Sequence, residues 1–212
     1  MTAPAWCFLV VAGLLAGTGW LASWRRWRVV VVIARPAAMA SLAGVAVWML
    51  DVDPAARAFV TAGVILGGVG DLLLALPRHY FASGSSLFMA ARVLYGAGFV
   101  AQGVDYGAAV LVLTVALFSL LTVGRILMGQ IRRLRPGMVP GAIAYMLVTA
   151  GVVGLGVATS DPTAGLAVVV LALSDVLLGW NRFVRALSGG HGSIHVVAHT
   201  AQALLVMSLV GS

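Results

Sequence analysis

The sequence has 212 residues, of which 62% are hydrophobic and only 9% charged, and its mean hydropathy is +1.08. This composition excludes a soluble globular enzyme and is typical of a protein with several membrane-spanning segments. The net charge of +7 comes from arginines scattered in short groups between apolar runs, so it indicates membrane topology and no nucleic-acid partner.

Apolar runs long enough to cross a bilayer follow one another along almost the whole chain. A helix needs about 20 residues to span about 30 Å of hydrocarbon, and backbone hydrogen bonding in lipid makes such runs helical. The runs fall at residues 5–23, 30–50, 58–76, 85–102, 107–124, 138–158, 163–180 and 193–211. The sequence therefore predicts an all-α fold, a single integral membrane domain over residues 1–212 with eight transmembrane helices.

The arginines indicate how these helices are oriented. If the loops alternate between the two sides of the membrane, Arg57 lies on one side, and the other side receives Arg25, Arg26, Arg28, Arg35, Arg78, Arg125, Arg132, Arg133, Arg135, Arg182 and Arg185. Arginine-rich loops face the cytoplasm by the positive-inside rule. We therefore expect a multi-pass protein of a bacterial inner (cytoplasmic) membrane, with both termini outside.

A short pattern recurs between the two halves of the chain. The first copy is Arg35-Pro36, Asp53-Pro54 and Asp71, and the second is Arg135-Pro136, Asp161-Pro162 and Asp175. This recurrence predicts two parallel four-helix halves, residues 1–104 and 105–212, related by an axis along the membrane normal. The alternative is that short motifs recur by chance in a biased sequence.

Two carboxylates, Asp71 and Asp175, lie inside these apolar runs. A charged side chain at membrane depth costs about 2.5 to 3.5 kcal/mol on insertion scales, so such an acid is a functional-site hypothesis. The alternative is a structural role, in which each acid joins helices through a hydrogen bond or a buried ion pair. In the functional interpretation one carboxyl acts as an acid and the other as a base, which suits hydrolysis through an oxocarbenium-like cation.

Other polar side chains are expected at the same depth on neighbouring helices, namely Arg92, Tyr95, Tyr145, His195 and His199. Arg92 stays protonated, so it either pairs with an aspartate or binds a phosphate oxygen. Arg35 is either a topological signal at the start of its helix or a phosphate ligand. His195 and His199 share a helix face at metal-ligand spacing, although two histidines alone are weak support for a metal site.

A set of motifs extends over most of the chain: Gly70-Asp71-Leu-Leu-Leu, then Phe88, Tyr95 and Phe99, then Val139-Pro140 with Tyr145, then Ser174-Asp175 with Phe183, then Ala201-Gln202. Together these residues resemble the YhhN-like lysoplasmalogenase family of eight-helix membrane proteins. The resemblance implies an ether hydrolase that cleaves the vinyl ether bond of lysoplasmalogens. The products would be a fatty aldehyde and a glycerophospho-ethanolamine or glycerophosphocholine.

The resemblance also implies roles for the polar residues. Asp71 and Asp175 would be the catalytic acid and base, in an order that the sequence leaves open. Arg35 or Arg92 would bind the lipid phosphate, and the side chains that orient the water or the acids would be Tyr95, Tyr145, His199 and Gln202. We expect neither a metal ion nor a cofactor. The chain departs from the family at Arg92, where the family usually has a histidine.

Two other classes of function compete with an intramembrane lipid hydrolase. The first is a small membrane transporter built from two parallel halves, although the two acids lie away from the midplane that transporters favour. The second is a noncatalytic lipid-binding protein, in which replacement of either aspartate changes stability more than turnover. The expected partners are a lysophospholipid and the bilayer, and the sequence leaves the oligomeric state open.

Overall fold

The computed structural model describes residues 1–76, 80–187 and 190–211. Over these ranges the chain is helical and contains no strand, which confirms the all-α prediction. The long helices are α1 (Ala3–Arg25), α2 (Arg28–Val47), α3 (Pro54–Ala75), α4 (Phe81–Gln102), α5 (Tyr106–Leu134), α6 (Val139–Val157), α7 (Pro162–Phe183) and α8 (Gly190–Met207). Two short 3-10 helices, η2 (Pro136–Met138) and η3 (Ser208–Gly211), precede α6 and follow α8.

The length and hydropathy of these helices make the chain an integral, multi-pass membrane protein. Within the described residues, seven helices are each long and apolar enough to cross a bilayer. The remaining one, α5, bends by 43° between its parts Tyr106–Ser119 and Leu121–Leu134, and counting it as one span brings the number to eight.

The length of α5 differs from the sequence-based prediction. The apolar run at residues 107–124 predicted a helix that ends before Arg125, with the following arginines in a loop. The helix instead continues to Leu134 and carries Arg125, Arg132 and Arg133 on its last turns. Its end has a local cause, because Arg135 precedes Pro136 and a residue before proline disfavours the helical conformation.

Aspartate caps explain part of the recurring pattern. The side chains of Asp53, Asp105 and Asp161 accept hydrogen bonds from backbone N–H groups in the first turns of α3, α5 and α7. In α3 and α7 a proline follows the cap, at a position where its missing N–H costs nothing. The Asp-Pro repeats are therefore local helix-start signals.

The Arg-Pro repeats occupy different places in the two halves. Pro36 lies inside α2, whereas Pro136 begins η2 between α5 and α6. This component of the predicted duplication therefore has no structural counterpart. The organisation into two parallel four-helix halves stays a prediction.

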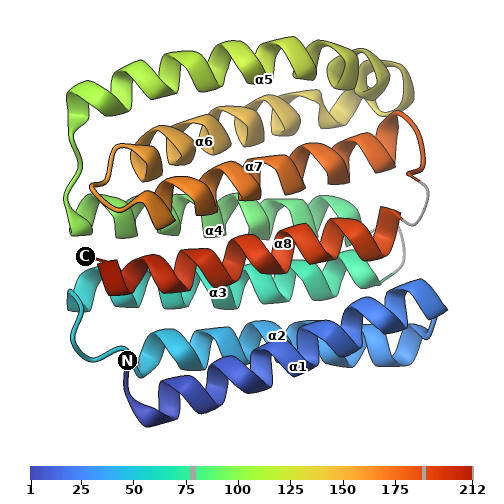
Figure 1. The fold of residues 1–212 in the computed structure, drawn as a ribbon. Helices are drawn as coiled ribbons and strands as arrows, with labels where there is room; N and C mark the ends of the chain where they lie inside the picture. Colours follow the sequence, from blue (N-terminus) through green and yellow to red (C-terminus); the bar gives the residue numbers. More distant parts are fainter. Residues whose placement is uncertain (77–79, 188–189, 212) are drawn as a thin grey trace.

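The helices lie side by side in a bundle whose chain termini share one end (Figure 1). The opposite end holds the α1–α2, α5–α6 and α7–α8 connections and carries Arg26, Arg135 and Arg185; we call it the basic end. Arg78, which the sequence also assigned there, lies outside the described residues. Helix α8 packs against α1, α2, α3 and α7, so residues far apart in sequence meet around it, while α5 lies at the edge of the bundle against α6 and α7.

Candidate functional site

Two buried polar clusters form where the helices approach the basic end. The first is centred on Arg35 of α2 and Asp71 of α3, which are 4% and 6% exposed. Arg35 Nε donates a hydrogen bond to Asp71 Oδ2 at 3.0 Å, and Arg35 Nη2 pairs with Asp71 Oδ1. His195 of α8 completes the group, with its Nδ1 at 2.5 Å from Arg35 Nη2 and 3.6 Å from Asp71 Oδ1. We call this group the Asp71 cluster.

His199 lies one helical turn further along α8 and joins the same cluster. Its Nδ1 accepts a hydrogen bond from Trp20 Nε1 of α1 at 3.0 Å, so its proton resides on Nε2. That Nε2 atom lies 3.9 Å from Asp71 Oδ2. Over the part of the chain that the structure describes, no group of three or more His, Cys, Asp or Glu side chains is arranged to hold a metal ion.

The second cluster, which we call the Asp175 cluster, joins α4 to α7. Arg92 Nη2 donates to Asp175 Oδ1 at 2.8 Å, and Arg92 Nε donates to Oδ2 at 3.3 Å. Arg92 also lies over the ring of Phe88, 5.6 Å from its centre. The phenol of Tyr145 on α6 lies within interaction distance of Asp175. Arg92 Nη1 is buried and has no hydrogen-bond partner, so this cluster retains one unused donor.

A hydrogen bond between α4 and α8 lies next to both clusters. Tyr95 donates to Gln202 Oε1 at 2.5 Å, and both residues are buried. Tyr95 is one turn from Arg92 along α4, and Gln202 is one turn from His199 along α8. Gly63 of α3 makes room for this contact, because a side chain there would overlap the Tyr95 ring. The polar side chains expected at one depth therefore lie in two clusters, with the Tyr95–Gln202 pair adjacent to both along α4 and α8.

A cavity of about 310 Å³ reaches the Asp175 cluster from the basic end. It lies between α4, α5, α6 and α7 and is lined mainly by apolar side chains, with Phe81 and Phe183 near the basic end. Asp175 is the one carboxylate among the residues that line it, and Tyr145 and Thr149 line it from the neighbouring helix α6. The cavity lining therefore combines one carboxylate with two hydroxyl-bearing side chains among apolar residues.

Thr149 is a site residue that the sequence reasoning missed. Its Oγ1 is buried and has no hydrogen-bond partner, and the residue is only 4% exposed. A buried hydroxyl without a partner costs about 1 to 3 kcal/mol, so its placement in a cavity wall is suited to a ligand that supplies the missing bond. The sequence contained one signal for this residue: Thr149 is four residues from Tyr145, so the two share a helix face.

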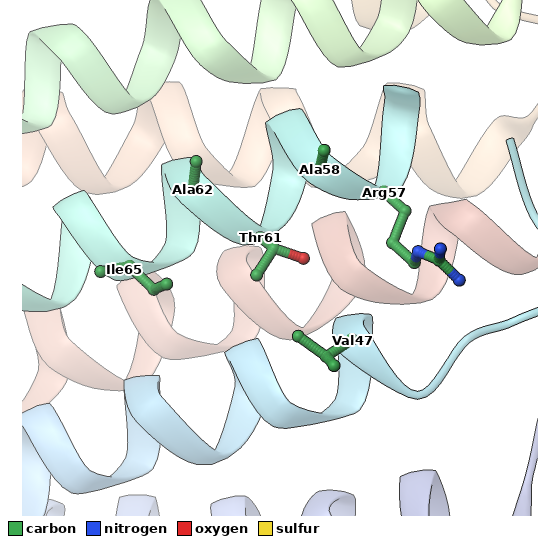
Figure 2. Close-up of a pocket in the computed structure, with 6 residues that line it drawn as sticks. All are labelled: Val47, Arg57, Ala58, Thr61, Ala62 and Ile65. Atoms are coloured by element: carbon green, nitrogen blue, oxygen red, sulfur yellow. The ribbon is translucent and has the colours of Figure 1, made fainter. Parts of the chain in front are cut away.

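A second pocket of similar volume lies between α2 and α3 near the other end of the bundle. Figure 2 shows its six lining residues, Val47, Arg57, Ala58, Thr61, Ala62 and Ile65. Arg57 donates to the backbone carbonyl oxygen of Met49 at 3.1 Å. The lining contains no carboxylate and no imidazole, so this pocket lacks the groups that acid–base chemistry needs.

Comparison with known proteins decides the family. The YhhN family matches residues 30–209, which includes every residue of both clusters except Trp20. The chain belongs to the YhhN family. Human lysoplasmalogenase TMEM86B is 26% identical over 165 residues, covering 78% of this chain and 69% of the human protein. No solved structure matches the chain.

In this YhhN protein the structure bears on the two roles, ion pairing and phosphate binding, that the sequence left open for the arginines. Arg35 forms an ion pair with Asp71 and Arg92 forms one with Asp175, which confirms the pairing role expected for Arg92 and reveals one for Arg35. Neither arginine lines the cavity. Phosphate binding by Arg35 or Arg92, and the substrate-orienting roles of Tyr95, Tyr145, His199 and Gln202, stay predictions.

Proposed function

We propose that this YhhN protein is an intramembrane ether hydrolase that cleaves the vinyl ether bond of lysoplasmalogens, releasing a fatty aldehyde and a glycerophospho-ethanolamine or glycerophosphocholine. The observation that carries the proposal is the position of Asp175 in the wall of a mainly apolar cavity that Tyr145 and Thr149 also line. The family membership and the human lysoplasmalogenase relative support the same class of substrate.

The shape and lining of the cavity suit a single-chain lipid. Its walls are mainly aliphatic and aromatic side chains, which bind an alkenyl chain by excluding water from it. The few polar groups on the walls then fix the ether oxygen and one water molecule. We assign this orienting role to the hydroxyls of Tyr145 and Thr149.

The chemistry needs one carboxyl group that gives up and regains a proton. Asp175 pairs with Arg92 as a carboxylate before the substrate enters, so the reaction begins when this carboxylate takes up one proton from solvent. With the substrate bound, the neutral carboxyl transfers that proton to the alkenyl carbon next to the ether-bearing carbon, and an oxocarbenium ion forms. The carboxylate, held by Arg92, then accepts a proton from the water that attacks this cation. The resulting hemiacetal breaks into the aldehyde and the alcohol, so one water is consumed and the carboxyl is restored.

Asp71 has a different place in this proposal. It does not line the cavity, and it is enclosed by Arg35, His195 and His199. We propose that the Asp71 cluster positions α8 and, through Gln202 and Tyr95, the segment of α4 that carries Arg92. Asp71 would thus affect turnover indirectly, by positioning the helices that carry the reacting groups.

We also propose that α5 is one bent span, giving eight, and that the basic end faces the cytoplasm with both termini outside. The chain has a single cysteine, Cys7, so labelling can test this orientation cleanly. In a Cys7→Ala background, an impermeant thiol reagent added to intact cells should label Thr2→Cys and leave Gly137→Cys unlabelled. Labelling of Gly137→Cys alone would reverse the orientation.

The activity is tested with two ether lysolipids that differ in one double bond. Detergent-purified protein should release fatty aldehyde from a 1-alkenyl lysophosphatidylethanolamine and should leave the saturated 1-alkyl analogue intact, because only the vinyl ether can be protonated on carbon. EDTA should not reduce the rate. Absence of aldehyde, under conditions where a known lysoplasmalogenase is active, would contradict the proposed function.

A further inference from the structure

We propose that Arg182 binds the headgroup phosphate of the lipid that occupies the cavity. This inference rests on the proposed function for the identity of the lipid. The physical argument for it is separate, because it concerns where a phosphate lies when the vinyl ether of a lysophospholipid is at Asp175 and the headgroup remains at the basic end.

Arg182 lies on the same face of α7 as Asp175. The two residues are seven apart, which is nearly two turns, and Gly179 between them lines the cavity. The rise of a helix places their Cα atoms roughly 10 Å apart along the axis. Side chains on a helix lean toward its N-terminus, so that of Arg182 extends back toward the cavity.

A ring contact places the Arg182 guanidinium next to a lining residue at the basic end of the cavity. Its central carbon lies 4.8 Å from the centre of the Phe81 ring, and Phe81 is one of the residues that line the cavity. Phe183, another lining residue, contacts Phe81 edge-on with ring centres 5.6 Å apart. A guanidinium stacked on a ring presents its N–H donors in its own plane, which is the geometry with which arginine binds phosphate.

The dimensions of a lysoplasmalogen fit this separation. Six bonds connect the ether-bearing alkenyl carbon to the phosphorus atom, and an extended chain of that length spans about 7 Å. A lipid with its vinyl ether at Asp175 therefore has its phosphate near the cavity mouth, within reach of Arg182. Arg92 is less suited to this role, because its guanidinium contacts Asp175 itself and so lies at the level of the vinyl ether, about 7 Å short of the phosphate. Arg35 is less suited because it pairs with Asp71, which does not line the cavity.

The test compares two substrates that share the alkenyl chain and differ in the phosphate. We expect Arg182→Gln to raise the KM for 1-alkenyl lysophosphatidylethanolamine roughly 10- to 100-fold and to change kcat little. This change in KM corresponds to the loss of one hydrogen bond to a charged group. The KM for 1-alkenylglycerol, which has no phosphate, should not change. Arg185→Gln is the matched control, because it removes one exposed charge just beyond the end of α7 and should affect neither substrate.

Equal losses on both substrates would overturn the inference, because Arg182 would then only shape the cavity mouth. An equal effect of Arg185→Gln would also overturn it, by showing a general attraction of the basic end for anionic lipid. Free inorganic phosphate should compete poorly at millimolar concentration, whereas a lysophospholipid should compete well; efficient competition by inorganic phosphate would contradict a headgroup site.

Equilibrium binding separates this inference from the proposed function. Radiolabelled 1-alkyl lysophosphatidylethanolamine, a saturated analogue that hydrolysis leaves intact, should bind the wild type more tightly than Arg182→Gln, and 1-alkylglycerol should bind both equally. If no substrate is hydrolysed and this binding difference is present, the proposed function fails and the phosphate site stands. If hydrolysis is observed and the binding difference is absent, the phosphate site fails.

Discussion

The buried Arg92 guanidinium of α4 and the largely buried Asp175 carboxylate of α7 form an ion pair, with Nη2 and Oδ1 2.8 Å apart, that joins the two halves of the chain beside the apolar cavity. Removing one member of such a pair leaves the other charge buried and unpaired, which typically costs about 3 to 5 kcal/mol.

We therefore expect Arg92→Leu to destabilise the protein by about 3 to 5 kcal/mol. Replacing both residues, as Arg92→Leu with Asp175→Leu, should recover much of that loss, since an apolar pair leaves no uncompensated charge. Unfolding of the purified proteins in detergent, followed by circular dichroism, measures both values. If the single variant is as stable as the wild type, the ion pair is not a structural element of the bundle.

The Asp71 cluster gives a prediction that separates positioning from chemistry. Asp71→Asn should lower the unfolding temperature and reduce kcat several-fold with little change in KM, because this carboxylate holds Arg35 and faces His199 without lining the cavity. Asp71→Glu keeps the carboxylate, so its unfolding temperature and its kcat should both lie between those of Asp71→Asn and the wild type. If Asp71→Asn abolishes turnover while the fold and stability stay intact, Asp71 is a second reacting group.

Thr149→Val separates stability from activity. The hydroxyl has no partner in the protein, so replacing it with a methyl group should leave stability unchanged or raise it by about 1 kcal/mol. Turnover should nevertheless fall about 3- to 10-fold, because this factor corresponds to the free energy of one neutral hydrogen bond to substrate or water. Parallel measurements of unfolding temperature and aldehyde release check both parts. Loss of stability would show that Thr149 has an internal partner.

A bulky residue at Gly141 should block the cavity without disturbing the fold. Gly141 lines the cavity, and a side chain added there meets no atom within 4 Å. Gly151 on the same helix is equally unobstructed and lies outside the cavity, so Gly151→Leu is the matched control. We expect Gly141→Leu to lose lysolipid turnover and Gly151→Leu to retain it. Equal activity of the two variants would contradict substrate binding in this cavity.

The sequence predicted the helices well because hydropathy alone identifies a run that spans a bilayer. It also placed Asp71 and Asp175 at similar depth, since depth follows directly from the helical rise. It could not predict the Arg35–Asp71 pair, because which residues face each other depends on how α2, α3 and α8 rotate about their axes. The cavity could not be predicted for the same reason, because its position also depends on how the helices are rotated. It reaches Asp175 and does not reach Asp71.

The misjudged end of α5 has a different origin. A charged residue such as Arg125 ends an apolar run without ending a helix, so hydropathy placed the boundary too early. Thr149 was missed because a threonine in an apolar helix is ordinary. Its four-residue spacing from Tyr145 was a weak sequence signal, and the missing hydrogen-bond partner of its hydroxyl is visible only in the folded protein.

Hydrolysis of a lysoplasmalogen in deuterium oxide tests the central claim most directly, since protonation on carbon leaves a permanent label. Wild-type protein should release an aldehyde that carries one deuterium on the carbon next to the carbonyl, measured by mass spectrometry against an aldehyde control kept in the same solvent. Folded Asp175→Asn should release no aldehyde above background. Aldehyde without deuterium, or release by Asp175→Asn at the wild-type rate, would contradict proton transfer from Asp175 to the vinyl ether.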